Sequence, residues 1–462
     1  MQSIYIIKNE KLDNFTKKLQ QFYYSNWYFL LLFLVTFLFW IFDLSIYSIA
    51  ILFFISVISL LTNKDILPSL PVFALIVITV SKTTFLLKKT NILTCTICII
   101  LYIFAVFFNI FHFKQQFRIG KLSYSLLLVS ISLLLGGIFS KYLESYTNGL
   151  TFSLSLGVLM LFLYTYMISC INTPKKIDFS RYFAKILLLF TVLACLQIIT
   201  AHSKINGEFE SHIRAILDVG WANRSGLSDL IVLTMPASFY LAETAKKYNF
   251  TYFLLANGIY ICLFASFSRG AMLFGTIEFL VIVLYLYIKS CHKKAFILSR
   301  FIWIIILIIT ICLNLELVQI LVDKFTEIGV QSSGRTALYS EAINLFLENI
   351  AFGVGLGYTG NNFVVENNCI YWFHSTPLQV MASLGLFGVM CYLMYYIKKF
   401  GILLKNNSLF ARCILCAVLF FELHCLLEPF TFQPLPQTFI AILCVAFVEN
   451  NLNKDNFCNK KR

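Results

Sequence analysis

The chain has 462 residues, of which 59% are hydrophobic and only 13% are charged, and its mean hydropathy is +0.82. A soluble domain carries about 25% charged residues, so this composition excludes a soluble globular enzyme, a disordered protein and a disulfide scaffold. Lys and Arg number 36 against 22 Asp and Glu. In a membrane protein such an excess collects in short cytoplasmic loops, so we expect no nucleic-acid partner.

Fourteen predominantly apolar runs approach the roughly 20 residues that a helix needs to cross the hydrocarbon layer. They predict an all-α polytopic membrane protein with about 12–14 transmembrane helices. In chain order the runs are 27–43, 44–62, 67–87, 91–113, 122–142, 150–171, 181–200, 226–243, 250–267, 270–288, 299–318, 377–397, 409–426 and 437–449. Ahead of them, a short interfacial helix is predicted from the helical spacing of Leu12, Phe15, Leu19 and Phe22.

The loops between the runs divide into two sets by charge. One alternating set is rich in lysine and arginine, whereas the loops around 143–149 and 427–436 carry neither. Because short cytoplasmic loops collect positive charge, we expect the first set and both termini in the cytoplasm. The basic residues of the first set are Lys175, Lys176, Arg181, Lys246, Lys247, Lys289, Lys293, Lys294, Arg300, Lys398, Lys399, Lys405, Lys460, Lys461 and Arg462.

The runs and loops together give six segments. Two loops assigned to the outer side are long, 201–225 and 319–376, and long connections are usually functional or disordered. In chain order the segments are a cytoplasmic N-terminal segment (1–26), N-terminal transmembrane helices (27–200), an outer loop with central transmembrane helices (201–318), a large outer loop (319–376), C-terminal transmembrane helices (377–449) and a cytoplasmic tail (450–462).

The large outer loop has the pattern of a folded cap. Ser333 is placed to cap a helix over 334–350, and Gly353, Gly355 and Gly357 follow as a flexible stop. We therefore expect a small helical cap over the outer membrane face. Its apolar face is formed by Leu338, Ala342, Leu345 and Phe346.

The cations expected on the outer side are mainly arginines: Arg214, Arg224, Arg269 and Arg335. Arginine offers a rigid fork of N–H donors that fits phosphate, so a diphosphate headgroup would explain this placement. For Arg214 and Arg224, pairing with acidic residues of their own loop is an equally good explanation.

Arg269 lies in the short sequence SFSRG (266–270), at the junction of two apolar runs, so we expect its guanidinium at or slightly below the membrane surface. Ionisable groups at such depth are costly and usually functional. The neighbouring Gly270 permits close backbone approach, which favours a functional site over a lipid-facing anchor.

His374 lies in an aromatic segment, directly before a helix that Pro377 is suited to begin. A neutral imidazole at that place is able to accept a proton from an acceptor hydroxyl. A histidine in an aromatic segment is more often an interface residue. The functional hypothesis is favoured here because the same loop supplies Arg335 and a cap helix.

No metal site is predicted. The chain has no Asp-x-Asp pattern, and the outer acids Glu327, Glu348 and Glu366 share no metal-like spacing. Two CxxC pairs lie within apolar runs, without a second CxxC or a histidine cluster, and we interpret them as packing residues. These pairs are Cys95/Cys98 and Cys413/Cys416.

Three blocks of the sequence resemble the bacterial O-antigen ligase/O-antigen polymerase superfamily. They are SFSRGAML (266–273), GRTALYSEAINLFLENIAFGVGLG (334–357) and FHSTPLQVMASLGLFG (373–388). In that family an SRG-type arginine ends one helix, a GR block lies in the large outer loop, and an HN- or HS-type histidine precedes the next helix. The resemblance rests on the order and spacing of the three blocks and on their expected position on the same outer face.

The resemblance covers roughly residues 215–400, and the segment GWANR (220–224) resembles a weaker upstream block of the family. The chain departs from the family pattern at two places. Ser375 replaces a commoner asparagine, which puts the role of that asparagine in doubt, and Asn349–Ile350 stand where a proline often precedes the glycine-rich turn.

The resemblance implies a GT-C-like, metal-independent, inverting glycosyltransferase without a cofactor. It would act outside the bacterial cytoplasmic membrane on an undecaprenyl-diphosphate-linked glycan donor and pass the glycan to a glycan or lipid acceptor. Arg269 and Arg335 would bind the diphosphate and His374 would be the general base. Substrate contacts would come from Arg214, Arg224, Ser268 and Ser375, and the partners would include membrane lipids, a flippase and a chain-length regulator.

Two other classes of protein remain as alternatives. A polysaccharide flippase or secondary transporter has a similar number of helices, but such proteins tend to show internal repeats and charges near the bilayer midplane. In the second half of this chain the candidates for such charges are Asp229, Glu278, Glu422 and His424. A membrane scaffold would leave the arginine and histidine residues without a purpose.

Overall fold

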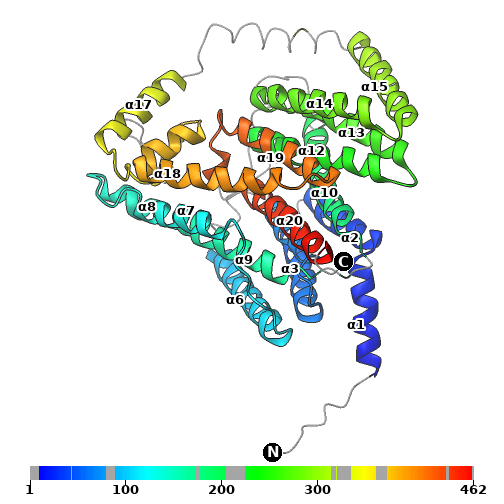
Figure 1. Ribbon diagram of the computed structural model, residues 1–462, viewed down its shortest axis with the longest axis horizontal. Coiled ribbons are helices and arrows are strands. Elements are labelled where there is room, and N and C mark those ends of the chain that lie inside the picture. The colour runs from blue at the N-terminus through cyan, green and yellow to red at the C-terminus, as the bar shows by residue number, and fades with distance from the viewer. Residues whose placement is uncertain are drawn as a thin grey trace, which may run out of the picture.

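The computed structural model describes residues 10–42, 44–79, 89–172, 174, 177–203, 224–313, 319, 335–359, 372–432 and 436–459. Apart from turns, the regular elements in these ranges are all helices (Figure 1), which confirms an all-α polytopic membrane protein. Each of the fourteen apolar runs overlaps a helix. The predicted interfacial helix is α1, and the predicted cap helix is α17.

The helices of the first half are α1 (Glu10–Tyr23), α2 (Asn26–Ile41), α3 (Ser45–Thr62), α4 (Leu70–Thr79), α6 (Lys89–His112), α7 (Ser123–Leu135), α8 (Leu143–Ser153), the π-helical turn η1 (Leu154–Leu159), α9 (Met160–Cys170) and α10 (Phe179–Ser203). Those of the second half are α12 (Arg224–Thr244), α13 (Asn249–Phe264), α14 (Arg269–Lys289), α15 (Lys293–Leu313), α17 (Arg335–Glu348), α18 (Thr376–Leu404), α19 (Leu409–His424), the 3₁₀ turn η3 (Phe430–Phe432) and α20 (Pro436–Asn459).

Six helices in the described ranges are long and apolar enough to cross a membrane, or seven if one bent pair counts as a single span. That pair joins Asn14–Tyr23 to Asn26–Ile41 at an angle of 71°. Four of the remaining apolar helices have only 10–17 described residues. Fourteen apolar runs therefore do not translate into fourteen straight full-length spans.

Helix α12 is the centre of the second half of the chain. It packs against α10, α13, α14, α19 and α20, and nearly all of its residues are buried. A helix that is surrounded by protein rather than lipid is able to carry polar side chains, since neighbouring helices supply the partners. Asp229 on this helix is such a case.

Helix α18 is kinked at Gly385, where φ is +64° and ψ is −162°. In a straight helix the N–H groups of Leu386 and Phe387 would bond to the carbonyls of Ala382 and Ser383. Here Leu386 N donates to Ile350 O (2.7 Å) and Phe387 N donates to Ala351 O (3.2 Å). The segment that follows α17 therefore replaces two rungs of the helix ladder.

The same segment also satisfies the carbonyls that the kink leaves without helical partners. Val354 N donates to Ala382 O and Gly355 N donates to Ser383 O, both at 2.9 Å. A Cβ on Gly353 would lie 2.4 Å from the carbonyl carbon of Ser383. Helix α17 ends at Glu348, before these glycines, and backbone hydrogen bonds from Val354 and Gly355 hold the segment against α18, so the prediction of a flexible stop is wrong.

We expect Gly385→Ala to destabilise the protein. The observed backbone angles are essentially restricted to glycine, and the strain costs about 1–3 kcal/mol. The added Cβ would also lie 2.6 Å from the carbonyl atoms of Ile350 and Ala351. Thermal unfolding in detergent measures the effect. Gly401→Ala on the same helix is the matched control, because no atom lies within 4 Å of its added Cβ, and an equal change in both variants would contradict the prediction.

Candidate functional site

Glu428, four residues beyond the end of α19, joins two of the predicted site residues. Its Oε1 lies 2.6 Å from Nη2 of Arg335, which begins α17. Its Oε2 lies 2.8 Å from Nδ1 of His374, which directly precedes the cap of α18. The carboxylate is mostly buried, with 13% of its side chain exposed, whereas Arg335 and His374 are 31% and 41% exposed. Three elements distant in sequence therefore meet at one acid.

The backbone holds His374 in a conformation that is uncommon for a residue with a side chain, with φ at +49°. Two hydrogen bonds and the burial of the neighbouring Phe373 ring hold this conformation. Tyr339 OH donates to His374 O (3.3 Å), Phe373 N donates to Gln379 Oε1 (3.0 Å), and the Phe373 ring is fully buried. Strained residues of this kind persist only where the surroundings determine them, and they cluster at functional sites.

The contact with Glu428 determines which nitrogen of His374 is available. An ionised carboxylate only accepts hydrogen bonds, so Nδ1 carries the hydrogen that it donates to Glu428. In the neutral ring Nε2 then keeps a lone pair. With the side chain of His374 half-exposed, this nitrogen is suited to take a proton from a substrate hydroxyl.

Arg335 approaches the same acid from the first turn of α17. A guanidinium has five N–H donors, and the contact described for Arg335 uses Nη2. The ion pair orients the side chain while other donors remain for a phosphate. Residues Ala342 and Leu345 of the same helix are buried against α18 and the glycine segment, which confirms the predicted apolar face of the cap.

Arg269 begins α14 and its side chain is exposed. Its neighbour Gly270 packs against the C-terminal end of α19, where an added Cβ would lie 2.7 Å from His424 Nε2 and 3.8 Å from Leu427 Cδ1. Leu427 directly precedes Glu428. The start of α14 therefore lies at the same end of α19 as Glu428 and its two partners, Arg335 and His374. No direct contact from Arg269 to these three residues is described.

A second histidine–carboxylate pair lies beneath the start of α14. His424 Nδ1 is 2.7 Å from Asp229 Oδ1 on α12, and both side chains are buried. This explains two of the four intramembrane candidates as partners of each other. Glu278, deeper on α14, is also buried, and neither of its carboxylate oxygens has a hydrogen-bond partner among the described residues.

The remaining predicted residues are placed less directly. Ser268 and Ser375 are buried at the caps of α14 and α18, and neither side chain makes a capping hydrogen bond. Arg214 lies outside the described residues. Arg224 begins α12, but its side chain is not described. Ser333 also falls outside the described ranges.

Glu428 is the site residue that the sequence did not single out. The sequence offers one weak signal: Glu428 is the only acid in the segment 427–436, which carries neither Lys nor Arg. Nothing in the local pattern shows that it faces residues 54 and 93 positions earlier in the chain. Among the described residues no group of three or more His, Cys, Asp or Glu is arranged to hold a metal ion.

Comparison with known proteins matches part of the chain to a described family. A family model described as O-antigen ligase matches residues 251–393, a range that contains Arg269, Arg335 and His374. A search of curated proteins finds no significant match. The three blocks that resembled the family all lie within the matched range. Over residues 251–393 the chain is therefore similar to the O-antigen ligase family, which agrees with the resemblance to the O-antigen ligase/polymerase superfamily in the three sequence blocks.

Proposed function

We propose that this protein transfers or polymerises undecaprenyl-diphosphate-linked oligosaccharide on the outer face of the cytoplasmic membrane, as a step in surface polysaccharide synthesis. The observation that carries the proposal is the position of Glu428 between Arg335 and His374. The carboxylate of Glu428 holds the Arg335 guanidinium next to the His374 imidazole and orients that ring as a base. A reaction that expels a diphosphate while deprotonating a hydroxyl requires both groups.

The reaction is a single inverting displacement. The acceptor hydroxyl gives its proton to Nε2 of His374 while its oxygen attacks the anomeric carbon of the donor. The bond between that carbon and the diphosphate oxygen breaks, and undecaprenyl diphosphate leaves with the electron pair. Guanidinium groups of Arg335 and Arg269 stabilise the charge that develops on the leaving group.

Glu428 acts through its neighbours. Its negative charge stabilises the imidazolium that forms when His374 takes the proton, and its second oxygen holds Arg335 at the same place. Two guanidinium groups supply the charge neutralisation that a metal supplies in other transferases. The reaction proposed here therefore proceeds without a metal.

The orientation rests on the charge of the loops. The basic loops belong in the cytoplasm, which places both termini inside and the ends of α18 and α19 that carry His374 and Glu428 outside. An undecaprenyl-linked glycan presented at the outer leaflet would meet the site there. The glycan or lipid acceptor would approach from the same side, and a flippase and a chain-length regulator are the expected protein partners.

The test is a glycan gel from a host strain that lacks the gene, complemented with wild type or His374→Ala. Wild type alone is expected to restore the glycan ladder. Glycan of a single repeat unit in the deletion strain indicates a polymerase, whereas loss of attached glycan with lipid-linked polymer accumulating indicates a ligase. Full rescue by His374→Ala would contradict the base assignment. Lipid-linked oligosaccharide trapped on the cytoplasmic leaflet would establish the transporter alternative instead.

A further inference from the structure

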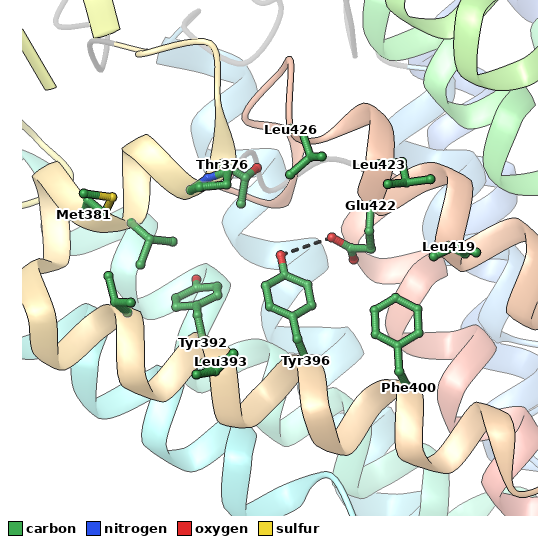
Figure 2. Close-up of a pocket in the computed structure, with 13 residues that line it drawn as sticks. Thr376, Met381, Tyr392, Leu393, Tyr396, Phe400, Leu419, Glu422, Leu423 and Leu426 are labelled. Atoms are coloured by element: carbon green, nitrogen blue, oxygen red, sulfur yellow. Dashed lines mark hydrogen bonds between the residues drawn. The ribbon is translucent and has the colours of Figure 1, made fainter. Parts of the chain in front are cut away.

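A groove of about 400 Å³ runs between α18 and α19 (Figure 2). Its size lies within the range of sites that hold organic ligands. One wall is formed by α18 and the other by α19. The lining residues that the argument uses are Thr376, Tyr392, Tyr396, Phe400, Glu422 and Leu426.

The rims of the groove face the lipid. Leu393 and Leu426 line it and are 58% and 47% exposed, and the lining is otherwise almost entirely apolar. Water has no hydrogen-bond partners along such a surface within the hydrocarbon layer. The natural occupant is therefore a hydrocarbon chain.

One end of the groove lies at the candidate site. Thr376 lines the groove and is two residues from His374. Its backbone N donates to Cys425 O (3.0 Å), and its hydroxyl donates to the carbonyl of Glu428 (3.3 Å). A molecule bound by Arg335 beside Glu428 would therefore have the mouth of the groove within reach of a directly attached chain.

We infer that this groove holds the first isoprene units of the donor's polyprenyl chain, an inference that rests on the proposed transfer from a polyprenyl diphosphate. In such a donor the diphosphate joins the lipid directly to the reacting carbon. In the acceptor at least one sugar separates the hydroxyl from any lipid. A groove that begins at the residues of the reaction therefore suits the donor lipid.

The wall of the groove fits an unsaturated, branched chain. The rings of Tyr392, Tyr396 and Phe400 follow one another at every fourth residue of α18 and line one wall, where the planes of the Tyr392 and Tyr396 rings are tilted by 45° to each other. The one carboxylate in the wall belongs to Glu422, which is paired with Lys399 and accepts a hydrogen bond from Tyr396 OH (3.1 Å; Figure 2). No unpaired charge is thus presented to the chain by these described residues.

Photo-crosslinking tests the inference directly. A benzophenone amino acid replaces Leu393, which lines the groove, or Met390, which does not. The two positions are a matched pair, since their exposed fractions are 58% and 59%. Each variant is placed in nanodiscs of phosphatidylethanolamine and phosphatidylglycerol with radiolabelled undecaprenyl diphosphate. We expect strong labelling at 393 and weak labelling at 390, with unlabelled undecaprenyl diphosphate competing and diacyl phosphatidic acid not competing.

Two outcomes would overturn the inference. Equal labelling at the two positions would show contact with the bulk bilayer, and competition by phosphatidic acid would show that the groove holds the acyl chains of phospholipids. Because labelling does not require turnover, the result is independent of transfer. Selective labelling at position 393 is compatible with a glycan ladder that stays intact when the gene is deleted. That combination would contradict the proposed function and would leave the assignment of the groove standing.

A bulky substitution gives a second measurement. Val389→Trp places a ring in the groove, and Met390→Trp places it outside. With a short synthetic glycosyl undecaprenyl diphosphate as donor, Val389→Trp is expected to raise KM by about tenfold or more, because the ring would occupy space that the polyprenyl chain needs. Met390→Trp should leave KM unchanged. A normal KM for Val389→Trp, with thermal stability retained, would contradict the inference.

Discussion

Glu428→Gln is expected to lower kcat for glycan transfer by at least about 10²-fold, which is the smaller part of what a positioned general base contributes. The glutamine fills the same space, but its amide is able to donate as well as accept, so it no longer fixes the hydrogen on Nδ1 of His374. It also lacks the charge that stabilises the imidazolium in the transition state. The carboxylate oxygen lies 2.8 Å from Nδ1 of His374. Both losses therefore act directly on the imidazole ring that takes the proton.

The measurement is single-turnover transfer by the purified protein, together with thermal unfolding in detergent. Glu348→Gln is the matched control, since this acid of α17 forms an exposed pair with Lys141. It should behave as wild type, because exposed pairs contribute little. A Glu428→Gln protein that unfolds at the wild-type temperature and turns over at the wild-type rate would show that the acid has no positioning role.

Lys399→Met is expected to cause the largest loss of stability, about 3–5 kcal/mol. Lys399 is buried, with 1% of its side chain exposed, and pairs with the nearly buried Glu422. Its ammonium also lies 4.7 Å from the centre of the Tyr396 ring. Removing the lysine leaves a carboxylate without its counter-charge, and that uncompensated charge is the main cost.

A variant that removes both charges separates this cost from the loss of packing. Lys399→Met combined with Glu422→Gln removes both charges, and we expect it to recover most of the stability that the single change loses. Lys398→Met is the control, since that neighbouring lysine is exposed. Unfolding in detergent reports all three variants. Equal effects of the changes at 398 and 399 would show that the pair contributes no more than a surface charge.

The sequence predicted the helices well for a physical reason. A chain in lipid must satisfy its backbone hydrogen bonds within each helix, so apolar runs mark helices directly. Residues 143–170, for example, form α8, η1 and α9 over the predicted run 150–171. What hydropathy does not give is how a helix is bent or how deeply it is buried.

The candidate site was only partly predictable. Arg269, Arg335 and His374 belong to sequence blocks whose types and order are local properties of the chain. Glu428 was missed because its meaning comes from two partners distant in sequence. Lys399 was assigned to a cytoplasmic loop together with Lys398, but the structure places it on α18, paired with an acid 23 residues later. Local charge patterns do not report such partners.

The kink in α18 has a consequence for how the protein is made. Before residues 350–355 reach α18, the N–H groups of Leu386 and Phe387 and the carbonyls of Ala382 and Ser383 lack their final partners. In hydrocarbon each such group costs several kcal/mol. The segment that satisfies them precedes α18 in the chain and leaves the ribosome first. During synthesis from the N-terminus, the segment 350–355 is therefore already present when α18, which depends on it, enters the bilayer.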